Sequence, residues 1–591
     1  MPPRPSPPTC GSGAFLFAAL NILEPLYETC LDQMEAFVAD LDRADPQHDP
    51  KRFRDFKDTL AKAAVHPNAR YFTLKSIILN NLFGVDIMEE AVEICKLRLF
   101  LKLAAQVDPD SKHENLGIEP LPDIDFNIPA GNTLVGYATY ADVKRALTSK
   151  LDFDNSLEII TKSAADLQQA FDAFRARQIE GDGSIPAQDK MALRHRLKNL
   201  EAQLDRHLAA AYGVSATNAA AYTKWRKSHE PFHWFIEFHG IMQDGGFDVI
   251  VGNPPYLELR QVYYRPQEFE SLDGNAIHAM CIERSIQLMK PAGSMSIIVP
   301  LSLPSTQRMR CVQDMLEGHG NAWYADFAWR PARLFDAVNR ALTMFIVTPR
   351  DDGKTSATGY QKWTSESRDG LVQRMSYVDV PRNRSIFWVP KLGDQIERTI
   401  LDKVTSVSTK RNHFVSRSDH GIYYRTTGGL YWKVFTDLAP AFNVNGVSGS
   451  SSRETHFSVA RREHVKPVIG ILSSSLFWWW YTISSNLRDL NHADIQSFHA
   501  PKRALEGLDV QEKSEKYFKE LSQNSTMLVR EQKSTGRTET KSFKIQKCKP
   551  TIDEIDRLIA PFYGLSGAEL DFIIHYDLKF RLGSDGDAAE Q

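Results

Sequence analysis

The chain has 591 residues, of which 25% are charged and 42% hydrophobic, and its formal net charge is −3. This length suffices for several domains, each with a hydrophobic core of its own. The composition is typical of a soluble globular protein. The slightly acidic balance excludes a globally basic protein, so a nucleic-acid site must be a local basic surface.

The six cysteines are far apart and form no CxxC pair, which argues against a zinc ribbon or a disulfide framework. This cysteine usage predicts a reducing, cytoplasmic location. We expect no contact with a membrane, because no apolar run approaches the roughly 18–20 residues of a membrane span. The N-terminus also lacks the apolar core of a signal peptide.

The first ten residues are rich in proline, which is excluded from central strands. Residues 9–16 then read Thr-Cys-Gly-Ser-Gly-Ala-Phe-Leu and lead into an apolar pattern typical of a helix. Small residues at the start of a helix let a ligand approach the backbone closely. Thr9, Gly11 and Gly13 are therefore candidate binding residues, and an ordinary loop is the alternative.

Residues 81–87 are expected to form a short strand ending near Asp86, and the following pattern predicts a helix over residues 89–105. The apolar stripe of this helix consists of Val92, Cys95, Leu99 and Leu103. An acidic residue at the end of such a strand can accept a hydrogen bond from the ribose of a cofactor. The alternative for Asp86 is a solvated helix N-cap.

Residues 151–230 are highly charged and helical in pattern, which predicts a helical insertion such as a hairpin. The leucines that carry the pattern are Leu193, Leu197, Leu200, Leu204 and Leu208. A solvated packing helix without DNA contact is the favoured interpretation. His229 and His233 complete a zinc-protease HExxH string, but Pro231 breaks the helix that such a site needs. We therefore expect no metal there.

The stretch over residues 247–256 organises the rest of the chain. An apolar run at residues 249–251 predicts a short buried strand, which ends in Gly-Asn-Pro-Pro-Tyr. Pro254 has a fixed φ and no N–H, and it holds Asn253 extended. The result is a rigid corner at the carboxyl end of a strand, where open α/β sheets bind ligands.

This corner suits one reaction well. The exocyclic amine of adenine is a poor nucleophile, and two acceptors aimed at its hydrogens would increase its reactivity. The side-chain oxygen of Asn253 and the carbonyl of Pro254 are the candidate acceptors, while the Tyr256 ring can stack on the base for about 1–3 kcal/mol. The alternative is a strand followed by a Pro-Pro turn.

The Asn253-Pro254-Pro255-Tyr256 motif resembles the catalytic motif of class I S-adenosylmethionine-dependent DNA adenine-N6 methyltransferases. The wider phrase from residue 231 to residue 256 looks like the methylases of type IIG and related restriction–modification systems. The resemblance implies a Rossmann-like methyltransferase sheet and S-adenosyl-L-methionine as the cofactor. It also assigns Thr9, Gly11 and Gly13 to the cofactor loop, Asp86 to the ribose and Asn132 to the neighbourhood of the cofactor's adenine. Asp123 and Asp125 are weaker candidates and can simply cap a turn.

One departure from the family pattern concerns the cofactor loop. Pro7 occupies the position of the family's acidic residue, and the first strand of the sheet is expected to be missing, as is the family's upstream Thr-Pro-type motif. The chain is therefore interpreted as N-terminally truncated. A separate N-terminal segment or another polypeptide is expected to complete the sheet.

After the corner, the pattern predicts a helix over residues 276–289 and strands over residues 294–300 and 341–347. Phe335 or Phe345 is a candidate for the second face of a flipped base, although core packing is favoured for both. From about residue 351 the alternation of strands and helices is lost. This region resembles an α+β target-recognition half, with candidate DNA contacts at residues 411–413, 423–429 and 461–462.

Four parts are therefore predicted: a cofactor-binding half (1–150), a helical insertion (151–230), a catalytic half (231–350) and a target-recognition region (351–591). The predicted function is site-specific adenine-N6 methylation of double-stranded DNA in a restriction–modification or phage-defence system. A nuclease is a possible separate partner, because the sequence has no PD-(D/E)xK nuclease signature. The alternatives are an inactive DNA-binding remnant, one half of a split methylase, and methylation of RNA or protein.

Overall fold

The computed structural model describes residues 5–6, 9–41, 53–66, 68–107, 109–112, 116, 121–148, 156–180, 186–349, 352–382, 386–407, 414–415, 418–427, 431–532 and 536–582. The chain divides into two compact units. The first comprises Met1–Val299, Cys311–Ala322 and Met344–Gly353, and the second comprises Pro300–Arg310, Trp323–Thr343 and Lys354–Gln591. The four-part division predicted from the sequence is not decided by this clustering and stays a prediction.

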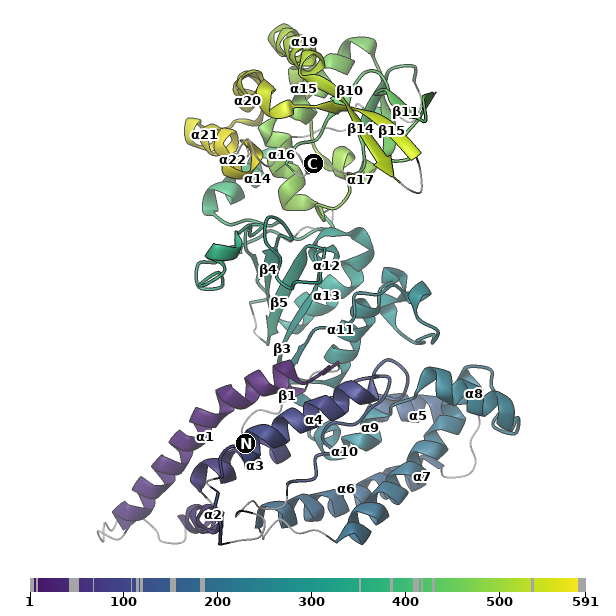
Figure 1. Ribbon diagram of the computed structural model, residues 1–591, viewed down its shortest axis with the longest axis vertical. Coiled ribbons are helices and arrows are strands. Elements are labelled where there is room, and N and C mark those ends of the chain that lie inside the picture. The colour runs from purple at the N-terminus through teal and green to yellow at the C-terminus, as the bar shows by residue number, and fades with distance from the viewer. Residues whose placement is uncertain are drawn as a thin grey trace. The chain divides into compact units, whose positions relative to one another are not determined.

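The first unit is rich in long helices, drawn in purple to blue in Figure 1. Its helices are α1 (Ala14–Leu41), α2 (Arg54–Val65), α3 (Ala69–Asn80), α4 (Glu89–Ala104), α5 (Tyr140–Thr148), α6 (Ser156–Glu180), α7 (Ala187–Ala211), α8 (Ala219–His229), α9 (Trp234–Glu237), α10 (His239–Gln243), α11 (Ile277–Leu288) and α13 (Arg310–His319). Its strands are β1 (Pro5–Ser6), β2 (Phe247–Gly252) and β3 (Met289–Pro300). Strands β4 (Asn321–Phe327) and β5 (Leu342–Thr348) contain residues of both units.

The larger sheet is mixed and has seven strands in the order β1-β2-β3-β5-β4-β6-β7. Strand β2 pairs in parallel with β1 on one side and with β3 on the other. The expected strand at residues 249–251 is thus confirmed, although Val249 and Val251 are half-buried rather than buried. Strand β3 begins earlier than expected, at Met289, because a register irregularity opposite residues 247–249 absorbs the Lys-Pro-Ala-Gly turn.

The first strand is short rather than missing, which corrects the sequence expectation. Pro5 pairs with Val249 and Ser6 with Ile250 in a parallel arrangement. Proline is tolerated here because β1 is the terminal strand of the sheet order, and strand edges admit residues without an N–H.

The predicted strand over residues 81–87 is not a regular strand, although its backbone is still paired. The N–H of Cys10 donates to the carbonyl of Val85 at 2.8 Å, and the N–H of Gly84 donates to the carbonyl of Asn127 at 3.0 Å. Asp86 forms an isolated parallel bridge with Ala130. Loops rather than strands supply these partners, so no continuous ladder forms.

The helix predicted after Asp86 is confirmed as α4, and its apolar stripe is buried. Val92, Cys95, Leu99 and Leu103 are at most 1% exposed and pack in one cluster with α1 and α3. Residues spaced by three and four positions share one face of a helix, so the spacing in the sequence was sufficient to place them.

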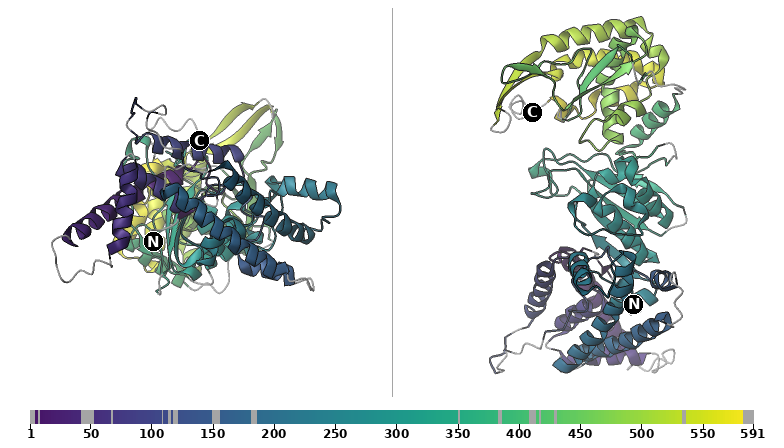
Figure 2. Two further views of the ribbon diagram at one scale, coloured as in Figure 1. Left: turned by 90° about the horizontal axis from the view of Figure 1, so that it is seen from below. Right: turned by 90° about the vertical axis from the view of Figure 1, so that its right-hand side faces the viewer.

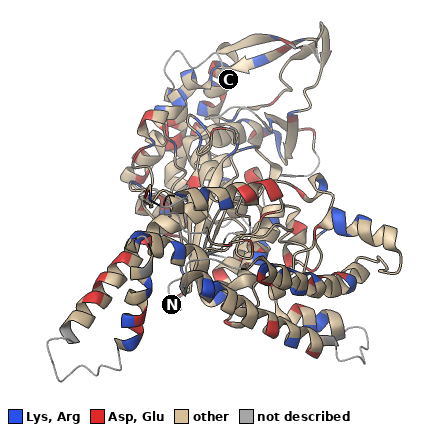
Figure 3. Cartoon of the chain, turned by 60° about the horizontal axis from the view of Figure 1, so that its bottom comes forward, with Lys and Arg blue, Asp and Glu red and all other residues tan. Residues whose placement is uncertain are grey.

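The helices expected over residues 151–230 are also present, as α6, α7 and α8. The five leucines of α7 that carry the pattern are all buried in a cluster that includes residues of α6 and α11. Figure 3 shows basic and acidic positions interspersed along the helices of the structure. This mixture is typical of a solvated helical surface.

One helix among the described residues, Ala14–Ala39 within α1, is long and apolar enough to cross a membrane by length and composition alone. The sequence expectation that no segment reaches that length is therefore not met. The finding is weak support for a membrane span, because the core helices of soluble proteins meet the same criterion. Leu16, Leu20 and Leu23 of this helix are buried against α3 and α4.

The second unit contains two small sheets and several buried helices, drawn in green and yellow in Figure 2. One sheet has the order β10-β9-β13-β8 and the other β12-β11-β15-β14. The strands of this unit are β6 (Thr355–Ala357), β7 (Val378–Asp379), β8 (Phe414–Val415), β9 (Gly421–Arg425), β10 (Phe435–Thr436), β11 (Phe442–Val444), β12 (Val447–Gly449), β13 (Glu454–Val459), β14 (Ser525–Gln532) and β15 (Gly536–Phe543). Its helices are α12 (Ser302–Ser305), α14 (Gln395–Ser406), α15 (Val465–Ser473), α16 (Ser475–Ser484), α17 (His492–Ser497), α18 (Lys502–Leu505), α19 (Leu508–Gln523), α20 (Lys549–Tyr563), α21 (Gly567–His575) and α22 (Leu578–Leu582).

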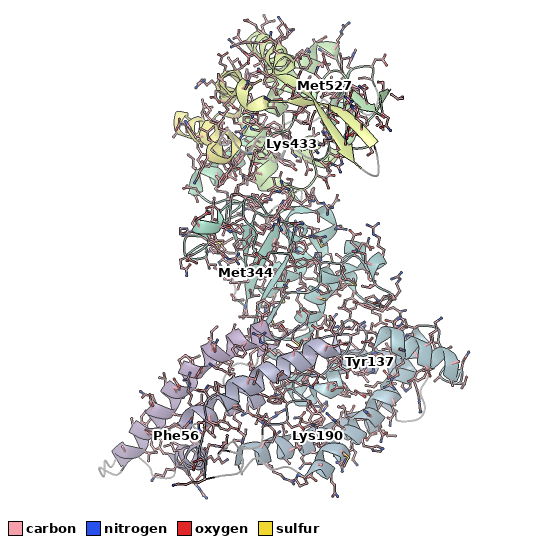
Figure 4. The ribbon with its side chains drawn as sticks, viewed as in Figure 1. Phe56, Tyr137, Lys190, Met344, Lys433 and Met527 are labelled. Carbon is pink, nitrogen blue, oxygen red and sulfur yellow. The ribbon has the colours of Figure 1, made fainter. Side chains whose placement is uncertain are left out.

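Asp125 joins helices α4 and α7. Its carboxylate is paired with Lys96 of α4 at 2.8 Å and with Lys190 of α7 at 2.6 Å, and also with Arg194. Lys190 is labelled in Figure 4. Burial raises the pKa of Asp125, but the hydrogen bonds from the two lysines outweigh it and lower this pKa to about 2.

We predict that Asp125→Asn destabilises the protein by about 1–2 kcal/mol at pH 7, because the variant leaves the nearly buried Lys96 without its closest carboxylate. The folded-state pKa lies below the unfolded value of about 3.9, so this stabilisation is present above pH 4 and is lost as the pH falls toward 2. Urea unfolding midpoints measure the loss. The exposed ion-pair variant Asp189→Asn is the control and should lose less than about 0.5 kcal/mol; equal losses would refute the assignment.

Candidate functional site

The corner after β2 presents an amide and an aromatic ring together. Asn253 and Pro255 are exposed, Pro254 is buried and Tyr256 is half-buried. The Tyr256 hydroxyl donates a hydrogen bond of 2.6 Å to the side-chain oxygen of Asn253. This bond orients the amide and leaves the oxygen its second lone pair, so one acceptor position stays available for a ligand.

The loop before α1 is a tight turn held by backbone hydrogen bonds. The N–H of Gly13 donates to the carbonyl of Cys10 at 3.0 Å, and the N–H of Gly11 donates to the Asp86 carboxylate at 2.8 Å. Gly11 has φ +52° and Gly13 has φ +81°, the left-handed region that favours glycine. The helix then starts at Ala14, directly after the turn.

Asp86 connects this loop to a third segment. One carboxylate oxygen accepts from Gly11, the other accepts from the N–H of Met88 at 3.0 Å, and the backbone carbonyl accepts from Gly131 at 2.8 Å. The side chain therefore does more than cap α4, whose N-cap position is Met88. Each carboxylate oxygen keeps a further lone pair, so Asp86 is still able to accept hydrogen bonds from a ribose.

Asn132 lies directly beyond Gly131 and is 2% exposed. Its side-chain oxygen accepts from the N–H of Leu134 at 3.1 Å, whereas its side-chain nitrogen has no hydrogen-bond partner among the described residues. The buried hydroxyl of Thr9 is likewise without a partner within the described part of the chain. Buried polar groups of proteins are normally hydrogen-bonded, so two such atoms in one region fit a site that a polar ligand completes.

The loop at residues 9–13 and the corner at Asn253 are connected through the β1–β2 pair. Ser6 pairs in parallel with Ile250, and Thr9 and Asn253 each follow their paired residue by three positions. Parallel strands end at the same edge of a sheet, so both segments leave the sheet on one side. Hydrogen bonds thus link Gly11 through Asp86 to Gly131, the residue before Asn132, while Thr9 and Gly13 belong to the same loop as Gly11.

Sequence reasoning missed the segment that holds Asn132 in place. The N–H of Asn132 donates to the carbonyl of Glu230 at 2.9 Å, and the N–H of Phe232 donates to the carbonyl of Val135 at 2.7 Å. A Cβ on Gly136 would lie 2.0 Å from the carbonyl oxygen of Phe232, so only glycine fits. The glycines on either side of Asn132 were the available signal for this close approach.

The HExxH string is divided between two structural elements. Helix α8 ends at His229, and Glu230 is left-handed with φ +46°, so the predicted helix break is present. His233 instead donates from Nε2 to the Asp205 carboxylate at 3.1 Å, and its Nδ1 accepts from the N–H of Tyr137 at 3.2 Å. It is a hydrogen-bonded core histidine.

The weaker candidates have structural partners. Asp123 accepts from the N–H of Asp125 at 3.0 Å, as a turn-capping carboxylate does. Phe345 is fully buried, while Phe335 is half-buried. Of the candidate DNA contacts, residues 411–413 and 428–429 lie outside the described residues, and Arg461 and Arg462 are exposed.

Part of the chain that includes the Asn253 corner is similar in sequence to known proteins. Residues 80–328 match the family model described as Eco57I restriction-modification methylase. A protein of Methanocaldococcus jannaschii, described as a type II restriction enzyme and methyltransferase, is 30% identical over 270 residues. The aligned part covers 38% of this chain and 22% of that protein, so the chain spans about a fifth of the relative's length.

Two solved structures of restriction–modification enzymes overlap with most of the chain. The Type IIL enzyme MmeI in complex with DNA has a TM-score of 0.40 at 10% identity, covering 97% of this chain and 72% of MmeI. A nuclease-deletion mutant of the Type ISP enzyme LlaGI with a DNA substrate mimic has a TM-score of 0.39 at 8% identity, covering 91% and 48%. Overlaps of this quality support no inference about the chain, and the sequence match over residues 80–328 is what relates it to methylases of restriction–modification systems.

We predict that Gly13→Ala damages the loop more than Gly11→Ala does. Both substitutions add about 1–2 kcal/mol of left-handed strain, but only the Cβ at position 13 would meet a neighbour, at 2.3 Å from the Cys95 sulfur. A Cβ at position 11 meets nothing within 4 Å. Thermal unfolding and calorimetric titration with S-adenosylmethionine measure the difference; equal effects would contradict the packing of Gly13 on Cys95.

Proposed function

We propose that this chain transfers a methyl group from S-adenosylmethionine to the exocyclic N6 amine of an adenine in double-stranded DNA. One observation carries the proposal: an exposed asparagine, oriented by Tyr256, stands on a proline-fixed corner at the sheet edge that also bears the Gly11–Asp86 loop. The match of residues 80–328 to a restriction-modification methylase supports it.

The cofactor would be held by the residues around the loop. The backbone of Gly11 and Gly13 leaves room for close approach, the Asp86 carboxylate accepts from ribose hydroxyls, and the free side-chain nitrogen of Asn132 and the hydroxyl of Thr9 offer polar contacts. Bound there, S-adenosylmethionine supplies an electrophilic methyl group on a sulfonium sulfur.

The corner residues would position and polarise the target amine. A base of duplex DNA must first leave the stack, which costs a few kcal/mol. The Asn253 side-chain oxygen and the Pro254 carbonyl would then accept hydrogen bonds from the two N–H groups of the amine. These bonds would direct the nitrogen lone pair toward the methyl group. In this arrangement the amine nitrogen would take the methyl group in place of the sulfonium sulfur, and the proton that the amine gives up would pass to solvent. Positioning supplies most of the catalysis in this scheme.

A second candidate is DNA binding without methyl transfer. It is favoured by the two-residue length of β1 and by Pro7, which stands where related loops carry an acid. Incubation with tritiated S-adenosylmethionine and adenine-containing duplex DNA separates the two candidates. Label in N6-methyladenine supports the methyltransferase, and DNA binding without any label supports the second candidate.

We predict that Asn253→Ala lowers the rate of methyl transfer by at least about 100-fold, because an acceptor used in the transition state is lost. DNA binding should stay close to that of the unaltered chain, since Asn253 is one of many contacts. Asn199→Ala, an exposed asparagine of α7, is the matched control and should keep full activity. Retained activity in Asn253→Ala would refute the assigned role.

Two variants of Tyr256 distinguish the contribution of base stacking from that of the hydrogen bond to Asn253. Tyr256→Ala removes the ring and should lower kcat/KM by about 5- to 150-fold, the equivalent of the roughly 1–3 kcal/mol of a base–aromatic stack. Tyr256→Phe keeps the ring and removes the hydroxyl that bonds to Asn253, so its loss should be smaller. If both variants lose activity equally, the hydroxyl rather than the ring is the important group.

A further inference from the structure

A cavity of about 250 Å³ in the second unit is lined by residues of both small sheets. Strand β9 contributes Arg425 from one sheet, and β14 and β15 contribute Leu528, Arg530, Thr540 and Ser542 from the other. Leu528 pairs with Thr540 across the hairpin, and alternate residues of a strand share a face. One face of the β14–β15 hairpin therefore lines the cavity, and Lys541 and Phe543 of β15 add to the lining.

The charge of the lining is strongly one-sided. Five basic residues and one acidic residue line the cavity; they are Arg425, Lys433, Arg453, Arg530, Lys541 and Glu454. This imbalance differs from the chain as a whole, in which acidic residues slightly outnumber basic ones. A concave site with one sign of charge concentrates ions of the opposite sign.

Two further arginines of the cavity act on Arg425. Arg425 ends β9 opposite Glu454, and the carbonyl of Arg453 accepts from the N–H of Thr426 at 2.8 Å, so Arg425 and Arg453 lie at neighbouring strand ends. Burial lowers the pKa of Arg425, and Arg453 and Arg530 lower it further, while Glu454 opposes them. A group of cations that disfavour each other is stabilised by a bound anion.

The remaining groups of the lining suit oxyanions. Thr540 and Ser542 bring hydroxyl donors, and Tyr423 adds a half-buried aromatic ring beside them. Lys433, labelled in Figure 4, is 9% exposed, with its nitrogen 4.8 Å from the centre of the Tyr481 ring. Burial lowers its pKa to about 8, which an adjacent anion would reverse.

We propose that this cavity binds consecutive backbone phosphates of a DNA strand, with Arg425, Arg453 and Arg530 as the contacts. Arginine presents a planar fork of donors that matches phosphate oxygens, and hydroxyl side chains commonly add further phosphate contacts. The proposal rests on the proposed function in taking DNA as the substrate. It assigns phosphate binding to the second unit and methyl transfer to the first.

The test is the salt dependence of DNA binding by the full chain. Binding of a fluorescein-labelled 30-base-pair duplex of random sequence is measured by anisotropy, without cofactor, from low to moderate salt. Each lost phosphate contact should reduce the slope of log affinity against log salt concentration by about 0.9. Arg425→Ala, Arg453→Ala and Arg530→Ala should each show this reduction and weaken binding of different sequences alike.

Two further variants keep the test decisive. Glu454→Gln removes the one acid of the lining and should tighten binding, an effect that misfolding does not produce. Arg557→Ala changes an exposed arginine of α20 and is the matched control, whose slope should equal that of the unaltered chain. Unchanged slopes in all three cavity variants, or an equal fall in Arg557→Ala, would overturn the proposal.

The outcome is independent of the methyl-transfer assay. Reduced slopes in a chain that transfers no methyl group would support the cavity and refute the methyltransferase. Methyl transfer with unchanged slopes would do the reverse. A loss confined to particular DNA sequences would show that the arginines contact base edges, and would also refute phosphate binding.

Discussion

The parallel pairing of Pro5 and Ser6 with Val249 and Ile250 is the contact on which the candidate site depends. It joins two segments that are far apart in the chain, and it sets the loop at Thr9–Gly13 and the corner at Asn253 on one edge of the sheet. Because β1 has two residues and one of them is a proline, few hydrogen bonds hold this arrangement directly. The surrounding contacts must therefore stabilise it.

Asp86 and the segment at residues 230–232 supply much of that support. Asp86 accepts three hydrogen bonds, one from the glycine loop, one from the start of α4 and one from Gly131. The carbonyl of Glu230 and the N–H of Phe232 then fix the backbone around Asn132. Two of the bonds to Asp86 end on its carboxylate and depend on that side chain, whereas the bonds of Gly131, Asn132 and Phe232 join backbone groups that a side-chain substitution does not remove.

The distribution of charged residues differs between the two units. The described helices of the insertion carry both signs of charge side by side, and their leucines are buried in the first unit. The strongly basic lining occurs instead in the second unit, where three arginines share a cavity. A chain with a net charge of −3 thus still has a local surface suited to an anion.

Local patterns were sufficient wherever a single face or a single turn decided the structure. Val92, Cys95, Leu99 and Leu103 predicted a buried helix face, and the run before Gly252 predicted a strand. Strand β4, with its aromatic residues, was not foreseen, and neither was the irregular path through residues 81–87. Those features are determined by pairing partners that are distant in the sequence. The strand propensity of a residue type carries no information about such partners.

The sequence by itself determined the chemical character of this protein: the Asn-Pro-Pro-Tyr corner, the small-residue loop and Asp86, whose resemblance to methylases needs no coordinates. Only the tertiary structure decided that the proline-rich start still pairs with β2, that the Asp86 carboxylate holds the glycine loop, and that Arg425, Arg453 and Arg530 line one cavity. The physical reason is that residue types and spacing act over a few turns of the chain. Strand pairing and charge clustering arise only when segments distant in the sequence pack together.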